Sequence, residues 1–297
     1  VTDRFLSTVA PALQGEYTDQ AINVIAEKIA NSQRLSLKDK DKFLKTLEND
    51  TALNVDLLLA PGHHAIADLC NNLPTSIAML AEFLSFGAGA KRKGKGEHAL
   101  AILSKRIAVT GVGDIIIDGT NAIELKVATT SGSGRLGEGG RSLEHVLQIL
   151  NQFPELKPII SDRKTKGLNI ENFVKEINAI QPELTSERRD AIGRAVFEDR
   201  FGNQARHLIN AFAKPNADPA VIRNKYIQAN FMWYKGNAMG GKWQTLVSMD
   251  FGSKNTFIVA RTSTELINLY KNGYLLKDTP YVIPTSATDI FYQVNPT

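Results

Sequence analysis

The sequence predicts a mixed α/β protein, because apolar residues recur at two different spacings along the chain. Residues 1–90 and 168–214 repeat apolar side chains at helical spacing. Residues 107–129 and 243–260 instead contain short runs rich in β-branched residues and bounded by turn signals. A chain of 297 residues can bury a sizeable core, either as one large domain or as two small ones.

The N-terminal part of the chain, residues 1–90, is expected to be mostly helical. Residues 18–30 repeat isoleucine at helical spacing behind a capping Thr18, and residues 36–47 and 76–86 follow the same pattern. We therefore predict an N-terminal helical region.

A β-hairpin is predicted next. Its strands are indicated by three short runs rich in β-branched residues: 107–112, 114–117 and 122–129. Asp118-Gly119 between the last two runs is a strong turn signal. A glycine-rich stretch, 131–140, and an amphipathic helix, 142–153, follow it.

The remainder of the chain is expected to add helices and then to complete the sheet. Residues 168–214 carry many charges of both signs at helical spacing, whereas the chain beyond Asn216 is richer in aromatic and β-branched residues. Strands are expected at 243–249 and 256–260, with a helix at 264–271. The predicted parts are therefore an N-terminal helical region (1–90), a core (91–167), a helical insertion (168–215) and a β-rich segment completing the core sheet (216–297).

The composition excludes several classes of protein. Hydrophobic residues make up 43% of the chain and charged residues 22%, which is ordinary for a soluble globular protein. The net charge of +4 is too weak, by itself, to indicate nucleic acid binding. The single cysteine, Cys70, excludes an intramolecular disulfide and a thiolate-rich zinc site, and a buried apolar thiol is expected there.

No membrane segment or nucleotide-binding loop is expected. No apolar run approaches the roughly 20 residues that span a bilayer, and the N-terminus does not read as a basic-then-apolar signal. No Gly-x-x-x-x-Gly-Lys-Ser/Thr motif occurs, so that a nucleotide cofactor is not expected. These patterns predict a cytoplasmic protein, or one packaged in a viral particle that assembles inside the cell.

A metal site is predicted where the hairpin begins. Asp114 follows Gly113 and opens a run of three isoleucines, where an unpaired carboxylate is costly to bury. Glu124 and Lys126 lie two residues apart on the next strand, so that both side chains project to one face. Magnesium prefers hard oxygen ligands, typically one or two carboxylates together with water and phosphate. Asp114, Glu124 and the Leu125 carbonyl are therefore candidate Mg²⁺ ligands, and Lys126 can orient or deprotonate the attacking water.

The length of the hairpin loop decides whether the two carboxylates share a face. The numbers of directly paired residues in a hairpin have a constant sum, and this sum must be even for Asp114 and Glu124 to share a face. An even sum requires an odd-membered loop or a bulge around residues 118–121. A two-residue loop would place them on opposite faces. In isolation, Glu124 and Lys126 are better explained as a solvated strand face with a cross-strand ion pair.

Glu97 is a further candidate carboxylate. It begins an apolar helical stretch after Gly94 and Gly96, with Leu100 on the same helical face, which places it near the edge of the sheet. Taken alone, a glutamate in the first helical turn is better explained by its interaction with the helix dipole.

The order of these motifs over residues 91–126 resembles the active-site signature of the PD-(D/E)XK nuclease superfamily, including its archaeal-type Holliday-junction resolvases. The motifs that carry the resemblance are Gly96-Glu97, Gly113-Asp114 and Glu124-Leu125-Lys126. Gly113 stands where a proline often precedes the aspartate. The Gln-x-x-x-Tyr motif of the exonuclease branch is not clearly present around Gln148, which argues against an exonuclease.

The resemblance implies a restriction-endonuclease-like α-β-β-β-α-β core, here with large helical additions, and Mg²⁺-dependent hydrolysis of phosphodiester bonds. It implies metal ligation by Asp114 and Glu124, a catalytic Lys126 and a supporting Glu97. Mn²⁺ is expected to substitute for Mg²⁺. DNA is the expected substrate, and a homodimer is expected because cutting both strands of a duplex usually needs two active sites.

Basic residues flank the candidate site and are candidate substrate contacts. Lys93 and Lys95 lie in a basic run that can neutralise phosphates, and His98 directly follows Glu97. Arg135 and Arg141 bracket the glycine-rich stretch and can bind phosphate bidentately. Each of these segments is also consistent with a solvated or unstructured loop.

Two functions from other classes compete with the nuclease. One is a structural or assembly protein, such as a component of a viral particle, that uses a nuclease-like fold without catalysis. The other is a non-catalytic DNA-binding module. An aromatic patch with interleaved lysines can stack the bases of single-stranded nucleic acid in such a module. The patch comprises Phe231, Trp233, Tyr234 and Trp243, although such residues more often pack a core.

Overall fold

The chain folds into two units. The first comprises Val1–Gly134, Met239–Glu265 and Asn295–Thr297, and the second comprises Arg135–Ala238 and Leu266–Val294. The computed structural model describes residues 1–9, 13, 17–84, 94–110, 113–128, 135–136, 142–161, 167–180, 184–237, 242–275, 280–283, 292–294 and 296–297.

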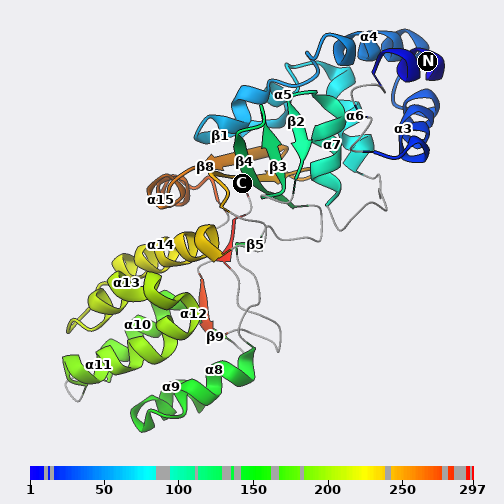
Figure 1. The fold of residues 1–297 in the computed structure, drawn as a ribbon. Helices are drawn as coiled ribbons and strands as arrows, with labels where there is room; N and C mark the ends of the chain where they lie inside the picture. The colour runs from blue at the N-terminus through cyan, green and yellow to red at the C-terminus, as the bar shows by residue number, and fades with distance from the viewer. Residues whose placement is uncertain are drawn as a thin grey trace. The chain divides into compact units, whose positions relative to one another are not determined.

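Among these described residues, six strands form one mixed sheet in the first unit (Figure 1). In spatial order the strands are β1 (Gly62–Ala65), β8 (Thr256–Ala260), β7 (Thr245–Asp250), β4 (Asn121–Ala128), β3 (Ile115–Ile117) and β2 (Ile107–Val109). The β4–β7 pair is parallel, and the other four neighbouring pairs are antiparallel. The sheet and its helices confirm the predicted mixed α/β class.

One face of the sheet is apolar, because alternate residues of its strands point toward two helices. Leu125 of β4 and Val247 of β7 are register partners and share a buried cluster with α6 (Pro74–Leu84) and α7 (Lys95–Leu103). Even-numbered residues of β4, including Glu124, therefore point to the opposite face.

Predicted side-chain caps begin two of the N-terminal helices. The Thr18 hydroxyl accepts a hydrogen bond from the first turn of α3 (Asp19–Asn31), and Ser36 does the same for α4 (Leu37–Glu48). Such caps satisfy N–H groups that a helix otherwise leaves unpaired. The helices α3, α4 and α6 match those predicted from apolar spacing.

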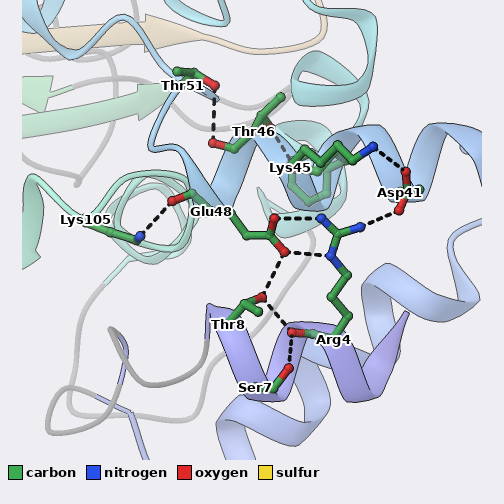
Figure 2. Close-up of polar contacts among 10 residues, drawn as sticks. Arg4, Ser7, Thr8, Asp41, Lys45, Thr46, Glu48, Thr51 and Lys105 are labelled. Atoms are coloured by element: carbon green, nitrogen blue, oxygen red, sulfur yellow. Dashed lines mark hydrogen bonds and ion pairs between the residues drawn. The ribbon is translucent and has the colours of Figure 1, made fainter.

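Arg4 joins the first helix, α1 (Thr2–Thr8), to α4 (Figure 2). Its Nε and Nη2 atoms each donate to the Glu48 carboxylate over 2.6 Å. Thr8 Oγ1 donates to the same carboxylate over 3.1 Å, and Lys105 Nζ donates to the Glu48 carbonyl over 3.0 Å. This network connects α1 and α4 to the C-terminal end of α7.

The stretch between α4 and α6 is less helical than predicted. It contains a 3₁₀ turn, η1 (Val55–Leu59), then β1, then the short helix α5 (Ile66–Leu69). The strand β1 pairs with β8 along its full length, so that pairing with a neighbour, rather than local sequence, makes these residues extended.

The second unit is mainly helical in the residues that are described. Its helical segments are α8 (Leu143–Leu150), η2 (Pro154–Leu156), α9 (Lys157–Ser161), α10 (Ile170–Ala179), α11 (Ser186–Gly193), η3 (Arg194–Glu198), α12 (Asp199–Phe201), η4 (Gly202–Ala205), α13 (Arg206–Phe212) and α14 (Pro219–Asn237). Two short strand pairs accompany them: β5 (Arg135–Leu136) with β10 (Tyr292–Gln293), and β6 (Leu168–Asn169) with β9 (Tyr281–Ile283). The helix α15 (Ser263–Lys271) begins in the first unit and ends in the second.

Two features differ from the predicted parts of the chain. Helix α14 occupies the start of the range 216–297, which was expected to be β-rich; its buried Ile222, Tyr226 and Tyr234 repeat at four- and eight-residue intervals. The boundary between the units falls inside the predicted core, 91–167, because residues from Arg135 onward belong to the second unit. Within the described ranges, no helix is both long enough and apolar enough to cross a bilayer.

Candidate active site

The hairpin turn places Asp114 next to the strand that carries Glu124. Residues 118–120 form a three-residue turn between β3 and β4, and the register pairs Ile115 with Ile123. This is the odd-membered turn that was expected for a shared site, and the paired register itself ends at Ile115 and Ile123. Strand β3 begins only after Asp114, whose N–H donates to the Ile123 carbonyl over 2.8 Å.

The Asp114 carboxylate turns toward β4 just before β3 begins. Its Oδ2 atom accepts a hydrogen bond of 2.8 Å from the Leu125 N–H. The carboxylate therefore accepts the hydrogen bond that a backbone carbonyl would accept if the β3–β4 ladder extended past Ile115. It lies one peptide group from Glu124.

Gly113 makes this position of Asp114 possible. Its φ angle is +70°, and a Cβ at Gly113 would lie 2.7 Å from the Ile123 carbonyl oxygen. A side chain would meet both a strained backbone conformation and a backbone atom that cannot move aside. Only glycine brings the chain this close to β4.

Glu124 and Lys126 form an ion pair on the face of β4 opposite α7. Lys126 Nζ donates to Glu124 Oε1 along the strand. Glu124 is only 5% exposed, and the Lys126 side chain is 21% exposed. The pair is therefore not the solvated strand face that the sequence alone favoured. A carboxylate this well buried is stable only with a close positive or hydrogen-bonding partner.

The Leu125 carbonyl lies at the same edge as the Asp114 carboxylate. In a strand, the N–H and C=O of one residue point to the same side, and the Leu125 N–H points toward β3. The neighbouring Ala122 carbonyl instead accepts from Gln244 N–H, on the β7 side. Because β3 begins only at Ile115, the Leu125 carbonyl is outside the β3 ladder.

Glu97 does not join Asp114 and Glu124 as a third carboxylate. Among the described residues, no three His, Cys, Asp or Glu side chains converge to hold a metal ion. Glu97 is the third residue of α7, and its carboxylate lies over the helix start: a Cβ on Gly94 would be 2.4 Å from Glu97 Oε2. This position favours the helix dipole over metal ligation.

The structure separates the candidate substrate contacts. Lys95 is exposed in the first turn of α7. His98 is instead only 5% exposed, and its Nδ1 lies 2.9 Å from the Tyr17 hydroxyl, so that its ring packs inside the unit rather than facing a substrate. Lys93, Arg141 and the Arg135 side chain lie outside the described residues.

The residues of the predicted aromatic patch divide between the two units. Trp243 lies just before β7 in the first unit, whereas the other three residues belong to α14 in the second. Phe231 and Tyr234 are buried, which agrees with core packing. Lys235 Nζ lies 5.8 Å from the centre of the Phe231 ring.

Ser248 of β7 is a residue of the site that the sequence analysis missed. It is the register partner of Lys126 across the parallel β4–β7 pair. Its side chain is fully buried, and among the described residues its hydroxyl has no hydrogen-bond partner. The signal was hidden, because the parallel pairing joins two segments far apart in sequence.

No protein-family model, curated protein or solved structure matches this chain. Whether the site suits a metal therefore depends on its own donors. Asp114 and Glu124 supply carboxylate oxygens, and Leu125 supplies a carbonyl oxygen beside them. Two carboxylates and one carbonyl suit Mg²⁺, which keeps several waters and binds few protein ligands.

Proposed function

We propose that this chain is a metal-dependent endonuclease that hydrolyses DNA phosphodiester bonds through Asp114, Glu124 and Lys126. The observation that carries the proposal is the 2.8 Å hydrogen bond from Leu125 N–H to Asp114 Oδ2. It brings one carboxylate to the strand that bears the other carboxylate and the lysine. The burial of Glu124 adds support, because a structural strand residue would not need a buried charge at this position.

The order of the elements also supports the proposal. Helix α7 precedes the antiparallel strands β2, β3 and β4, helices follow, and β7 then pairs parallel to β4. The resemblance to PD-(D/E)XK nucleases implies an α-β-β-β-α-β core, and this order agrees with it once the short strands β5 and β6, which lie between β4 and β7 in the chain, are set aside.

Each residue of the site has its own task in the proposed reaction. The carboxylates of Asp114 and Glu124 and the Leu125 carbonyl would hold Mg²⁺ or Mn²⁺, which supplies positive charge beside the reacting phosphate and makes water more acidic. Lys126 orients the attacking water, and its ammonium group offsets the negative charge that develops on the phosphate. Glu97 has no assigned task, because its carboxylate lies over Gly94.

The substrate is proposed to be DNA, with exposed Lys95 as a phosphate contact. Lys93, Arg135 and Arg141 are candidate phosphate contacts from their places in the sequence alone. Cleavage of both strands of a duplex usually needs two active sites, so that we include a homodimer in the proposal.

A cleavage assay tests this function. The intact protein is incubated with supercoiled plasmid, branched DNA and single-stranded DNA in Mg²⁺, in Mn²⁺ and in EDTA. We expect cleavage with either metal and none in EDTA. Asp114→Asn is expected to lower the rate by at least about 100-fold, because it removes the charge that binds the metal. The asparagine oxygen can still accept the Leu125 hydrogen bond, so that folding is expected to be retained.

Asp118→Asn is the matched control, since Asp118 is an exposed aspartate on the turn of the same hairpin. Its cleavage rate is expected to equal that of the intact protein. No cleavage of any substrate with either metal would contradict the proposal. Salt-sensitive DNA binding that survives Asp114→Asn would then favour a binding module, and absence of binding would favour a structural or assembly role.

A further inference from the structure

Ser248 faces the same side of the sheet as the Glu124–Lys126 ion pair. Lys126 and Ser248 are register partners in the parallel β4–β7 pair, and directly paired residues of neighbouring strands point to the same face. The preceding pair, Leu125 and Val247, points to the other face, into the buried cluster that includes α7. Ser248 is therefore beside Lys126 and on its side.

The Ser248 hydroxyl is a polar group in an apolar position. Its neighbours on this face, Leu246 on β7 and Ile258 on β8, are both fully buried. Ser248 is itself 0% exposed, and within the described part of the chain its Oγ has no hydrogen-bond partner. Burying an unpaired hydroxyl is unfavourable, and an alanine at this position would avoid that cost. A buried polar atom without a partner needs an explanation, and a second state of the site supplies one.

That second state follows from the chemistry of Glu124. In the structure, Lys126 donates to the Glu124 carboxylate. A divalent cation bound through Glu124 Oε1 would displace the ammonium group from that oxygen, so that Lys126 would lose this acceptor. A serine hydroxyl has two acceptor lone pairs. Of the two strands involved, β7 presents Ser248 next to Lys126 on the face where this exchange takes place.

We propose that Ser248 is a positioning residue, whose hydroxyl accepts a hydrogen bond from Lys126 once Glu124 binds a divalent cation. The inference rests on the proposed function, since it requires the metal site. Ser248 then holds the lysine beside the reacting phosphate instead of letting it turn away. In the absence of metal, the hydroxyl stays unpaired and lowers stability.

The test compares Ser248→Ala with Ser76→Ala. Ser76, on α6, is an equally buried serine whose hydroxyl also has no partner among the described residues, and it lies away from the site. Two quantities are measured for the full chain: the melting temperature in EDTA and the affinity for Mn²⁺ by electron paramagnetic resonance. Both variants are expected to melt at or above the temperature of the intact protein, because each loses an unpaired buried hydroxyl.

Only Ser248→Ala is expected to lose Mn²⁺ affinity, by on the order of tenfold, which is typical of a lost hydrogen bond to a charged group. Its kcat for DNA cleavage should fall while KM stays the same. Ser248→Thr, which keeps the hydroxyl, should restore Mn²⁺ affinity. If the extra methyl group of threonine prevents folding, Ser248→Ala decides alone, because its stability and its metal affinity are expected to change in opposite directions.

The outcomes separate this inference from the proposed function. Mn²⁺ binding by the intact protein that is unchanged in Ser248→Ala overturns the inference and leaves the nuclease proposal standing. Loss of affinity together with a lower melting temperature also overturns it, because that result indicates packing alone. Absence of Mn²⁺ binding by the intact protein overturns both.

Discussion

Gly96 of α7 and Val127 of β4 are in direct contact: a Cβ on Gly96 would lie 2.3 Å from Val127 Cγ2. The missing side chain lets the start of α7 approach the strand that carries Glu124 and Lys126. The glycine of the Gly96-Glu97 motif therefore has a packing role that does not depend on catalysis.

Gly96→Ala is expected to lower the free energy of unfolding by about 1–3 kcal/mol, because the added methyl group overpacks the contact with Val127. Urea denaturation measures the change. Combining it with Val127→Ala should recover part of the loss, since the second change removes the clashing methyl. Gly236→Ala in α14 is the control; it meets no atom within 4 Å and is expected to stabilise by about 0.4–1 kcal/mol. Equal effects of the two glycine changes would refute the packing argument.

Gly113→Ala is expected to cost more stability than Gly119→Ala. Both glycines have similar positive φ angles, +70° and +68°, so that backbone strain is shared. Only Gly113 has a close neighbour, the Ile123 carbonyl oxygen, whereas Gly119 has none within 4 Å. Strain alone costs about 1–2 kcal/mol for an alanine, and the clash adds to it at Gly113. Chemical denaturation of both variants checks the order, and a larger loss at Gly119 would contradict it.

Cys70 is expected to be unreactive in the folded protein. Burial raises the pKa of the Cys70 thiol to about 12 from an ordinary 9.0. A thiol reagent at pH 8 should therefore label the chain only after it is unfolded in urea. Because the pKa of Cys70 is higher in the folded protein, its buried neutral thiol contributes to the free energy of unfolding. This contribution is complete below pH 9 and is lost as the pH rises toward 12. Cys70→Ala should weaken that alkaline loss; labelling of the native protein as fast as of the unfolded one would contradict the burial.

The Arg4–Glu48 ion pair is expected to make the protein sensitive to acid. Hydrogen bonding from Arg4 holds the pKa of Glu48 below its usual 4.5. A lowered carboxyl pKa contributes stability above that pH, and the contribution is lost as the pH falls through the folded value. Glu48→Gln should therefore lower the melting temperature at pH 7, and its difference from the intact protein should shrink below pH 4.5. Glu27→Gln, at an exposed glutamate, is the control. An equal fall in its melting temperature would show that the Arg4–Glu48 pair does not cause the effect.

The hairpin and the helix caps could be predicted because their signals are local. Asp118-Gly119 marked the turn, and Thr18 and Ser36 marked the starts of helices. The placing of Glu124 and Lys126 on one strand followed from the same local pattern, whereas the position of Asp114 depends on the positive φ of Gly113.

The elements that were missed depend on contacts or patterns of longer range. β1 has no alternating apolar residues and is extended because β8 pairs with it. Aromatic residues of α14 suggested strands, although Ile222, Tyr226 and Tyr234 carried a helical repeat that was overlooked. Lys126 and Ser248 are paired across parallel strands that are far apart in sequence, and the register of a hairpin cannot predict such a pair.

The parallel β4–β7 pair also determines when the first unit can fold during synthesis. β4 is complete at Ala128, but its partner begins only at Thr245, after residues 129–244 have been translated. Until then the growing chain carries an open strand edge, which is a template for unwanted association with other chains. Pairing across so long a separation also slows folding. The ribosome must therefore synthesise all the helices from α8 to α14 before the sheet that holds Glu124 and Lys126 can close.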